Sequence, residues 1–153
     1  MTKEQPSPLI DYQKLVNVIY YNENFNFVGV ALQENSTDQK IRWRYAAGNQ
    51  GERFRKIVLR PGIGIAGLVI RTGKPYWDNY VANKNYADYM YRPITKIEKL
   101  TAVAAVPIFS NKASLVTGVL LGGYRGDHVV NKFTVYLLQN YLSGAATSDH
   151  HWR

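Results

Sequence analysis

Apolar residues recur at helical spacing near both ends of the chain. Near the start, this spacing predicts an amphipathic helix over about residues 8–22, with its apolar positions at Tyr12, Leu15, Val16 and Ile19. Near the other end, the same period predicts a helix that stops at Gly144, with its apolar positions at Val130, Phe133, Leu137 and Tyr141. Helices are therefore expected to begin and close the fold.

Between these helices the pattern changes to short β-rich runs separated by turn-forming residues. Four strands are predicted, at residues 26–33, 40–47, 101–109 and 115–124, and they should form two antiparallel pairs. The segment 62–99 should hold two or three short helices, interrupted by the stretch PYWDN at 75–79. The expected class is α+β, a central antiparallel sheet with the terminal helices on one face and a helical, ligand-covering insertion on the other.

The second predicted strand alternates strictly. Its apolar positions, which should share one buried face, are Ile41, Trp43 and Tyr45. Its cationic positions, which should share the solvated face, are Lys40, Arg42 and Arg44. The alternation therefore predicts that Trp43 points into the core.

Length and composition narrow the function classes. A chain of 153 residues is expected to form one domain, with a core at 8–147 and tails at 1–7 and 148–153. The absence of cysteine excludes disulfides, thiolate nucleophiles and iron–sulfur ligation. The net charge of +8 favours anions or an acidic partner. The first residues lack an apolar segment, which predicts a cytoplasmic protein without a membrane span.

The stretch RPGIGIAGLVIRTGKPYWDN at 60–79 combines a turn at 60–62 with a helix over 65–71 that Gly73 should cap. Positions 62–66 hold no Ser, Thr, Asp or Asn, so the helix start should have no side-chain cap. A bound anion could accept from the unpaired amides of Ile65, Ala66 and Gly67, with Gly64 at the entry of the helix. Alternatively, the glycines only permit a tight turn and close packing, with water on the amides.

A second helix start is expected in MYRPITKIEKL, where Pro93 suits the first helical position and the amides of Ile94 and Thr95 follow. Trp43 could add an indole NH, and Tyr91 a hydroxyl donor. Trp43 could equally be a core residue bonded to a backbone carbonyl, and Tyr91 could simply pack. Neither helix start brings an obligatory Arg or Lys, and uncharged NH donors suit a weakly hydrated monovalent anion better than a phosphate.

The order of elements and one set of motif residues resemble a GAF domain over nearly the whole chain. The motif residues are Gly62, Gly64, Gly67, Val69, Thr72, Gly73, Pro75, Ala105, Val106, Pro107 and Ile108. Within this family, Trp43 and the blocks GIGIAGLVIRTGKPYWDNY and MYRPITKIEKL are similar to stand-alone nitrate receptors. The resemblance implies an intracellular sensor that binds nitrate and acts on a sensor histidine kinase controlling nitrate respiration. A ligand-free interaction module, or a receptor for another small anion, stays open.

The remaining polar residues predict neither catalysis nor a metal site. His128 precedes the last helix, and His150 and His151 lie in the tail, so the three do not have metal-ligand spacing. No Ser-His or paired-carboxylate arrangement is present, which predicts no enzymatic activity. A basic group could contact nucleic acid, but a solvated face or an acidic protein partner is favoured; its residues are Lys40, Arg42, Arg44, Arg53, Arg55 and Lys56. The terminal helices could also pair two copies of the chain.

Overall fold

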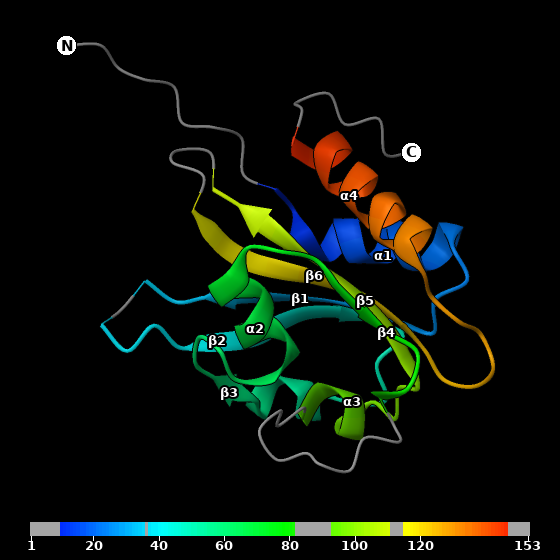
Figure 1. The fold of residues 1–153 in the computed structure, drawn as a ribbon, viewed down its shortest axis with the longest axis horizontal. Coiled ribbons are helices and arrows are strands. Elements are labelled where there is room, and N and C mark those ends of the chain that lie inside the picture. Colours follow the sequence, from blue (N-terminus) through cyan, green and yellow to red (C-terminus); the bar gives the residue numbers. More distant parts are fainter. Residues whose placement is uncertain (1–9, 36, 82–92, 111–114, 147–153) are drawn as a thin grey trace.

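One six-stranded antiparallel sheet forms the centre of the molecule, with strand order β3-β2-β1-β6-β5-β4 (Figure 1). The computed structural model describes residues 10–35, 37–81, 93–110 and 115–146. The strands are β1 (Phe27–Gln33), β2 (Ile41–Ala47), β3 (Val58–Leu59), β4 (Tyr76–Asp78), β5 (Ala102–Phe109) and β6 (Val116–Tyr124).

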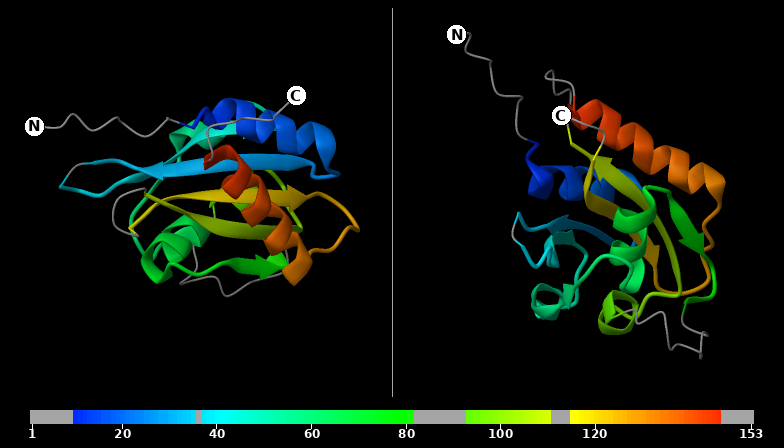
Figure 2. Two further views of the ribbon diagram at one scale, coloured as in Figure 1. Left: turned by 90° about the horizontal axis from the view of Figure 1, so that it is seen from above. Right: turned by 60° about the vertical axis from the view of Figure 1, so that its left-hand side comes forward.

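The helices divide between the two faces of this sheet. One face carries α1 (Tyr12–Asn22) and α4 (Lys132–Ala146), and the other carries η1 (Arg53–Lys56), α2 (Gly64–Thr72) and α3 (Pro93–Ile97) (Figures 1 and 2). Each face has its own buried apolar cluster. The expected α+β class, with terminal helices on one face and a helical insertion on the other, is confirmed.

The predicted strand pairs form, and they join into one sheet. β1 pairs with β2 and β5 with β6, and the antiparallel β1–β6 pairing links the two hairpins. The stretch 75–79, predicted to interrupt the helices, contains β4, which pairs with β5 at the sheet edge. The helices are interrupted there as predicted, but β4 itself was not predicted, because a strand of three residues is too short to show a clear alternation. β3 and η1 were not predicted.

Two helix boundaries differ from the prediction. α1 begins at Tyr12 rather than near residue 8, because the Asp11 carboxylate accepts the Lys14 amide at 3.0 Å and caps the helix. α4 continues through Gly144 to Ala146. Gly144 is not among the glycines with positive φ, so it does not adopt the left-handed conformation that ends a helix.

The predicted apolar face of α4 is also partly wrong. Phe133 is 66% exposed, whereas Val135 and Leu138 supply the fully buried contacts to the sheet. α4 begins at Lys132, directly after Asn131, whose side chain accepts the Phe133 amide at 2.8 Å, so Val130 precedes the helix instead of belonging to its apolar face. Phe133 therefore points to solvent.

A β-bulge changes the direction of Tyr45. Val30 pairs with Tyr45 while Ala31 pairs with Trp43, which leaves Arg44 as an extra residue in β2. Tyr45 consequently lies on the α1 face, where its ring is 5.9 Å from that of Tyr12. The prediction that Tyr45 shares the face of Trp43 was wrong, because the bulge breaks the two-residue period.

α4 is tied to the end of α1 by a hydrogen bond. The Tyr141 hydroxyl donates to Glu23 Oε2 at 2.7 Å. Burial raises the pKa of Tyr141, and the bond to Glu23 raises this pKa further. The hydroxyl therefore stays protonated at neutral pH and keeps this contact between the terminal helices.

The Asp11 cap gives a direct test of the α1 boundary. Asp11→Ala removes the acceptor for the Lys14 amide and should lower the free energy of unfolding by about 0.5–2 kcal/mol. Urea unfolding followed by circular dichroism measures this loss. Asp38→Ala is the control, because Asp38 is exposed and pairs with Lys40 at 3.6 Å on the surface. Equal losses in the two variants would contradict the capping role.

Candidate functional site

The start of α2 has the geometry of an uncapped helix. Arg60–Ile63 form the predicted turn, in which the Ile63 amide donates to the carbonyl of Arg60 at 2.9 Å. Gly64 opens the helix with φ of 72°, a conformation that residues with a Cβ rarely adopt. No side chain caps this end, and Gly73 ends the helix in the left-handed conformation, as predicted. The residues at the start of α2 are buried, and their amides have no acceptor from a capping side chain.

Gly67 shows that close packing also contributes to the glycine pattern. A Cβ at this position would lie 2.4 Å from the carbonyl oxygen of Arg60, so only glycine lets the helix approach its own entry turn. Gly67 is also the first residue whose amide has an intrahelical acceptor in a helix that begins at Gly64. The donors without such a partner are therefore the amides of Gly64, Ile65 and Ala66, and Gly67 lines the candidate site as the residue that makes room.

Trp43 carries the most informative group of the site. Its side chain is 1% exposed and lies on the face covered by α2 and α3. Gly29 on β1 makes room for both the Phe27 ring and the indole, since a Cβ there would be 2.9 Å from Phe27 Cζ and 3.3 Å from Trp43 Cε3. The indole Nε1 is buried and has no hydrogen-bond acceptor among the described residues. An unsatisfied buried donor costs about 1–3 kcal/mol, so an acceptor is expected to complete the site.

α3 supplies the second helix start. Pro93 is its first residue, as predicted, and Pro93, Ile94 and Thr95 are buried. One apolar cluster contains residues from the three parts of the candidate site: Trp43, Ile65, Ala66 and Ile94. Tyr91 lies outside the described residues. The structure thus brings together side chains from β2, α2 and α3 that are distant in the sequence.

The candidate site has no charged side chain among its described residues. Arg71 is the cation at the entry to α2: its Nη1 lies 2.7 Å from where a Cβ of Gly62 would be, but the side chain is exposed. The basic residues of β2 are directed elsewhere, since Arg42 binds Glu34 Oε2 at 2.6 Å and Arg44 occupies the bulge. An anion here would be held by NH dipoles in an apolar setting.

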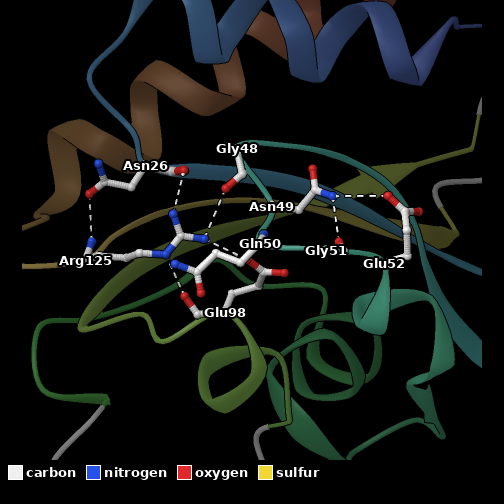
Figure 3. Close-up of polar contacts among 8 residues, drawn as sticks. All are labelled: Asn26, Gly48, Asn49, Gln50, Gly51, Glu52, Glu98 and Arg125. Carbon is white, nitrogen blue, oxygen red and sulfur yellow. Dashed lines mark hydrogen bonds and ion pairs between the residues drawn. The ribbon is translucent and has the colours of Figure 1, made fainter.

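A buried ion pair behind α3 was missed by the sequence analysis. Glu98, directly after α3, is 1% exposed, and its Oε1 accepts from Arg125 Nη2 at 2.6 Å and from the Gln50 amide at 2.9 Å (Figure 3). Arg125 also donates to the carbonyl oxygens of Asn26 at 3.2 Å and Gly48 at 3.1 Å. The only sequence signal is an isolated carboxylate at the end of a short helix, and nothing in the pattern pairs it with Arg125.

The part of the chain that the structure describes contains neither a metal-site cluster nor a membrane-spanning helix. No cluster of three potential metal-ligating side chains occurs there. His128 is exposed and stacks on Tyr124 with ring centroids 4.9 Å apart. None of the helices described has the length and apolar character required to cross a bilayer.

Comparison with known proteins identifies relatives of this chain among solved structures. No protein-family model matches the sequence, and a search of curated proteins finds no match. Among solved structures, NreA from Staphylococcus aureus, mutated in its nitrate-binding site, superposes with TM-score 0.68 and 36% identity over 75% of this chain and 83% of that chain. The chain belongs to the NreA family.

A second structure of mutated NreA from the same organism agrees, with TM-score 0.69 and 32% identity over 82% of this chain and 96% of that chain. The GAF domain/HD domain protein from Geobacter sulfurreducens matches with TM-score 0.67 over 88% of this chain and 87% of that chain, at 16% identity, which shows a shared fold alone. The fold of this NreA-family chain is therefore the GAF fold, as its glycine pattern predicted.

Proposed function

We propose that this NreA-family protein is an intracellular nitrate sensor that binds nitrate between β2, α2 and α3. The observation that carries the proposal is the Trp43 indole Nε1, which is buried and has no acceptor among the described residues. Nitrate would accept from this donor and from the amides at the start of α2. The remaining residues of the proposed site are Gly64, Ile65, Ala66, Gly67, Tyr91, Pro93, Ile94 and Thr95.

The chemistry of the site supports a small monovalent anion. A divalent anion would need compensating cations, because burying an unpaired charge in an apolar cluster is costly. Planar nitrate can accept hydrogen bonds at its edge while its face lies against apolar side chains such as Ile65 and Ile94. With four heavy atoms and a ceiling of about 1.5 kcal/mol per atom, binding is limited to about 6 kcal/mol, or a dissociation constant of roughly tens of micromolar. Such an affinity suits a reversible sensor.

The signalling role follows from the family resemblance. We infer that the nitrate-bound and nitrate-free forms act differently on a sensor histidine kinase of the NreB type, as the cytoplasmic receptor of a two-component system that controls nitrate respiration. No catalytic role is proposed. A ligand that binds one form more tightly shifts the population toward that form, and the kinase would respond to this shift.

A ligand-free interaction module is the second candidate, and the exposed aromatic residues of α4 favour it. Phe133 and Tyr136 are 66% and 50% exposed, and their rings pack edge-to-face 5.9 Å apart on the outer face of the helix. Contiguous exposed apolar side chains are typical of interfaces. This face could bind the kinase or a second copy of the chain. Light scattering over a concentration series separates self-association from a monomer.

Thermal unfolding with different anions tests the proposal. Nitrate at about 100 times its dissociation constant should stabilise the protein by about 2.7 kcal/mol, or about 5–10 °C for a chain of this size. Sulfate and phosphate at equal ionic strength should have little effect, because the described residues of the site include no cation to offset a second charge. Titration calorimetry then gives the affinity. Equal stabilisation by all three anions would indicate nonspecific binding to the basic surface, and no effect of nitrate would favour the ligand-free module.

A further inference from the structure

We propose that the Glu98–Arg125 ion pair is a positioning device for the anion site, which holds the start of α3 at a fixed place relative to the strand that carries Trp43. Its effect on nitrate affinity rests on the proposed function. The positioning of α3 itself can be tested without any ligand.

α3 needs an external anchor because it is very short. It spans Pro93–Ile97, and helices of this length are not stable by themselves. The anchor lies at its end, where the carbonyl oxygen of Glu98 accepts from Arg125 Nε at 2.7 Å (Figure 3). A guanidinium at this position also interacts favourably with the negative end of the helix. Arg125 therefore holds both the backbone and the carboxylate of the residue that closes α3.

The Glu98 carboxylate is buried and depends on two hydrogen-bond donors. Glu98 is 1% exposed, so water cannot replace its two hydrogen-bond donors, Arg125 Nη2 and the Gln50 amide. The carbonyl oxygen and the side-chain Oε1 of Glu98 thus both accept hydrogen bonds from the guanidinium of Arg125. Any shift of α3 must either move Arg125 or leave a buried carboxylate without its partner, which is strongly unfavourable.

The other side of the guanidinium is fixed to the sheet. Arg125 Nη1 donates to the carbonyl of Asn26, just before β1, and Nη2 donates to the carbonyl of Gly48, just after β2 (Figure 3). The Asn26 side chain accepts the Arg125 amide at 2.7 Å, which locks the arginine backbone as well. β2 also carries Trp43, so one residue ties α3 to the strand that presents the indole donor.

The same contacts join the ligand-covering face to the terminal helices. Asn26 lies in the connection from α1 to β1, and Arg125 lies in the connection from β6 to α4. A displacement of α3 is therefore transmitted through Glu98 and Arg125 to the junctions of both terminal helices. A continuous chain of hydrogen bonds of this kind would couple the site to the opposite face of the sheet.

The first experiment measures the positioning in the nitrate-free protein by amide hydrogen exchange. Glu98→Gln removes the charge while keeping the size of the side chain, and it should speed exchange of the Leu100 amide, which donates to the Thr95 carbonyl at 2.9 Å. The Gly73 amide at the end of α2 is the internal control and should not change. Glu34→Gln is the control variant, because Glu34 pairs with Arg42 of β2 at the same 2.6 Å, in a pair whose side chains are 33% and 34% exposed. Unchanged exchange at Leu100 would overturn the proposal.

The second experiment measures nitrate affinity and the Trp43 indole Nε1 resonance in the same variants, at a temperature where each is folded. Glu98→Gln should weaken nitrate binding by at least about tenfold, while Glu34→Gln stays within about twofold of the unmodified protein. Faster exchange at Leu100 with unchanged nitrate affinity would show that the pair stabilises α3 without positioning the site, and would overturn the inference.

The two proposals fail differently. If the unmodified protein shows no nitrate response at the Trp43 resonance, the proposed function fails, and the exchange data still decide whether the pair fixes α3. Should Glu98→Gln not fold, Arg125→Lys keeps the charge but loses the planar fork that reaches several acceptors at once. Arg125→Lys should show the same faster exchange of the Leu100 amide and the same weaker nitrate binding. If both quantities stayed equal to those of the unmodified protein, the inference would be overturned.

Discussion

Replacing Trp43 with phenylalanine should weaken nitrate binding by about 1.5–3 kcal/mol, or roughly 10- to 150-fold, because it removes one hydrogen bond to a charged ligand. Phenylalanine keeps an aromatic ring in the cluster formed with Ile65, Ala66 and Ile94. Titration calorimetry with nitrate measures the change. The affinity should fall without loss of the fold, since the backbone amides of the site are untouched.

The stability of the nitrate-free variant adds an independent check. Trp43 Nε1 has no acceptor among the described residues, so Trp43→Phe deletes a buried donor that is unsatisfied without ligand. Removing this donor should raise the free energy of unfolding and offset part of the stability lost with the larger ring. If the indole instead had an acceptor, Trp43→Phe would lose the stability from both the hydrogen bond and the packing. Trp77→Phe is the control, because Trp77 is 45% exposed on the edge strand β4 and should leave nitrate affinity unchanged. Unchanged affinity in folded Trp43→Phe would make Trp43 a core residue only.

The parts of the fold that follow from local chemistry were predictable. The uncapped start of α2, its Gly73 stop and the position of Pro93 depend on backbone preferences of single residues, and the structure confirms them. Tyr45 and Gly144 could not be placed in this way. The bulge that turns Tyr45 depends on how β1 and β2 pair, and α4 passes Gly144 because tertiary packing outweighs a weak local preference for stopping.

The candidate site shows the same division. Trp43 and the α2 amides could be proposed from a strand pattern and a helix start, because each signal lies within a few residues. The Glu98–Arg125 pair could not, since its partners are 27 positions apart and Arg125 also joins two other segments. Glu98 stands among other charged residues, between Lys96 and Lys99, so the sequence does not show that it is buried, and only the fold identifies its partner. The residues that hold the site in place were therefore less predictable than those proposed to contact the ligand.

Arg125→Ala should be the most destabilising of the substitutions considered, with a loss of about 3–5 kcal/mol in the free energy of unfolding. The variant leaves the Glu98 carboxylate, which is 1% exposed, without its cation. The carbonyls of Asn26, Gly48 and Glu98 also lose their donor. For a domain of this size the midpoint of thermal unfolding should fall by about 6–20 °C.

The double variant Arg125→Ala with Glu98→Gln separates these two costs. A neutral glutamine can still accept the Gln50 amide, which Glu98 Oε1 accepts at 2.9 Å, but it leaves no buried charge behind. The double variant should therefore be more stable than Arg125→Ala alone, although still less stable than the unmodified protein, because the three carbonyls remain without the guanidinium. Urea unfolding of all four proteins gives the coupling energy. If Arg125→Ala lost less than about 1 kcal/mol, in the range of exposed pairs, Glu98 would have to reach water or another donor, and the ion pair would not be what holds α3 against the sheet.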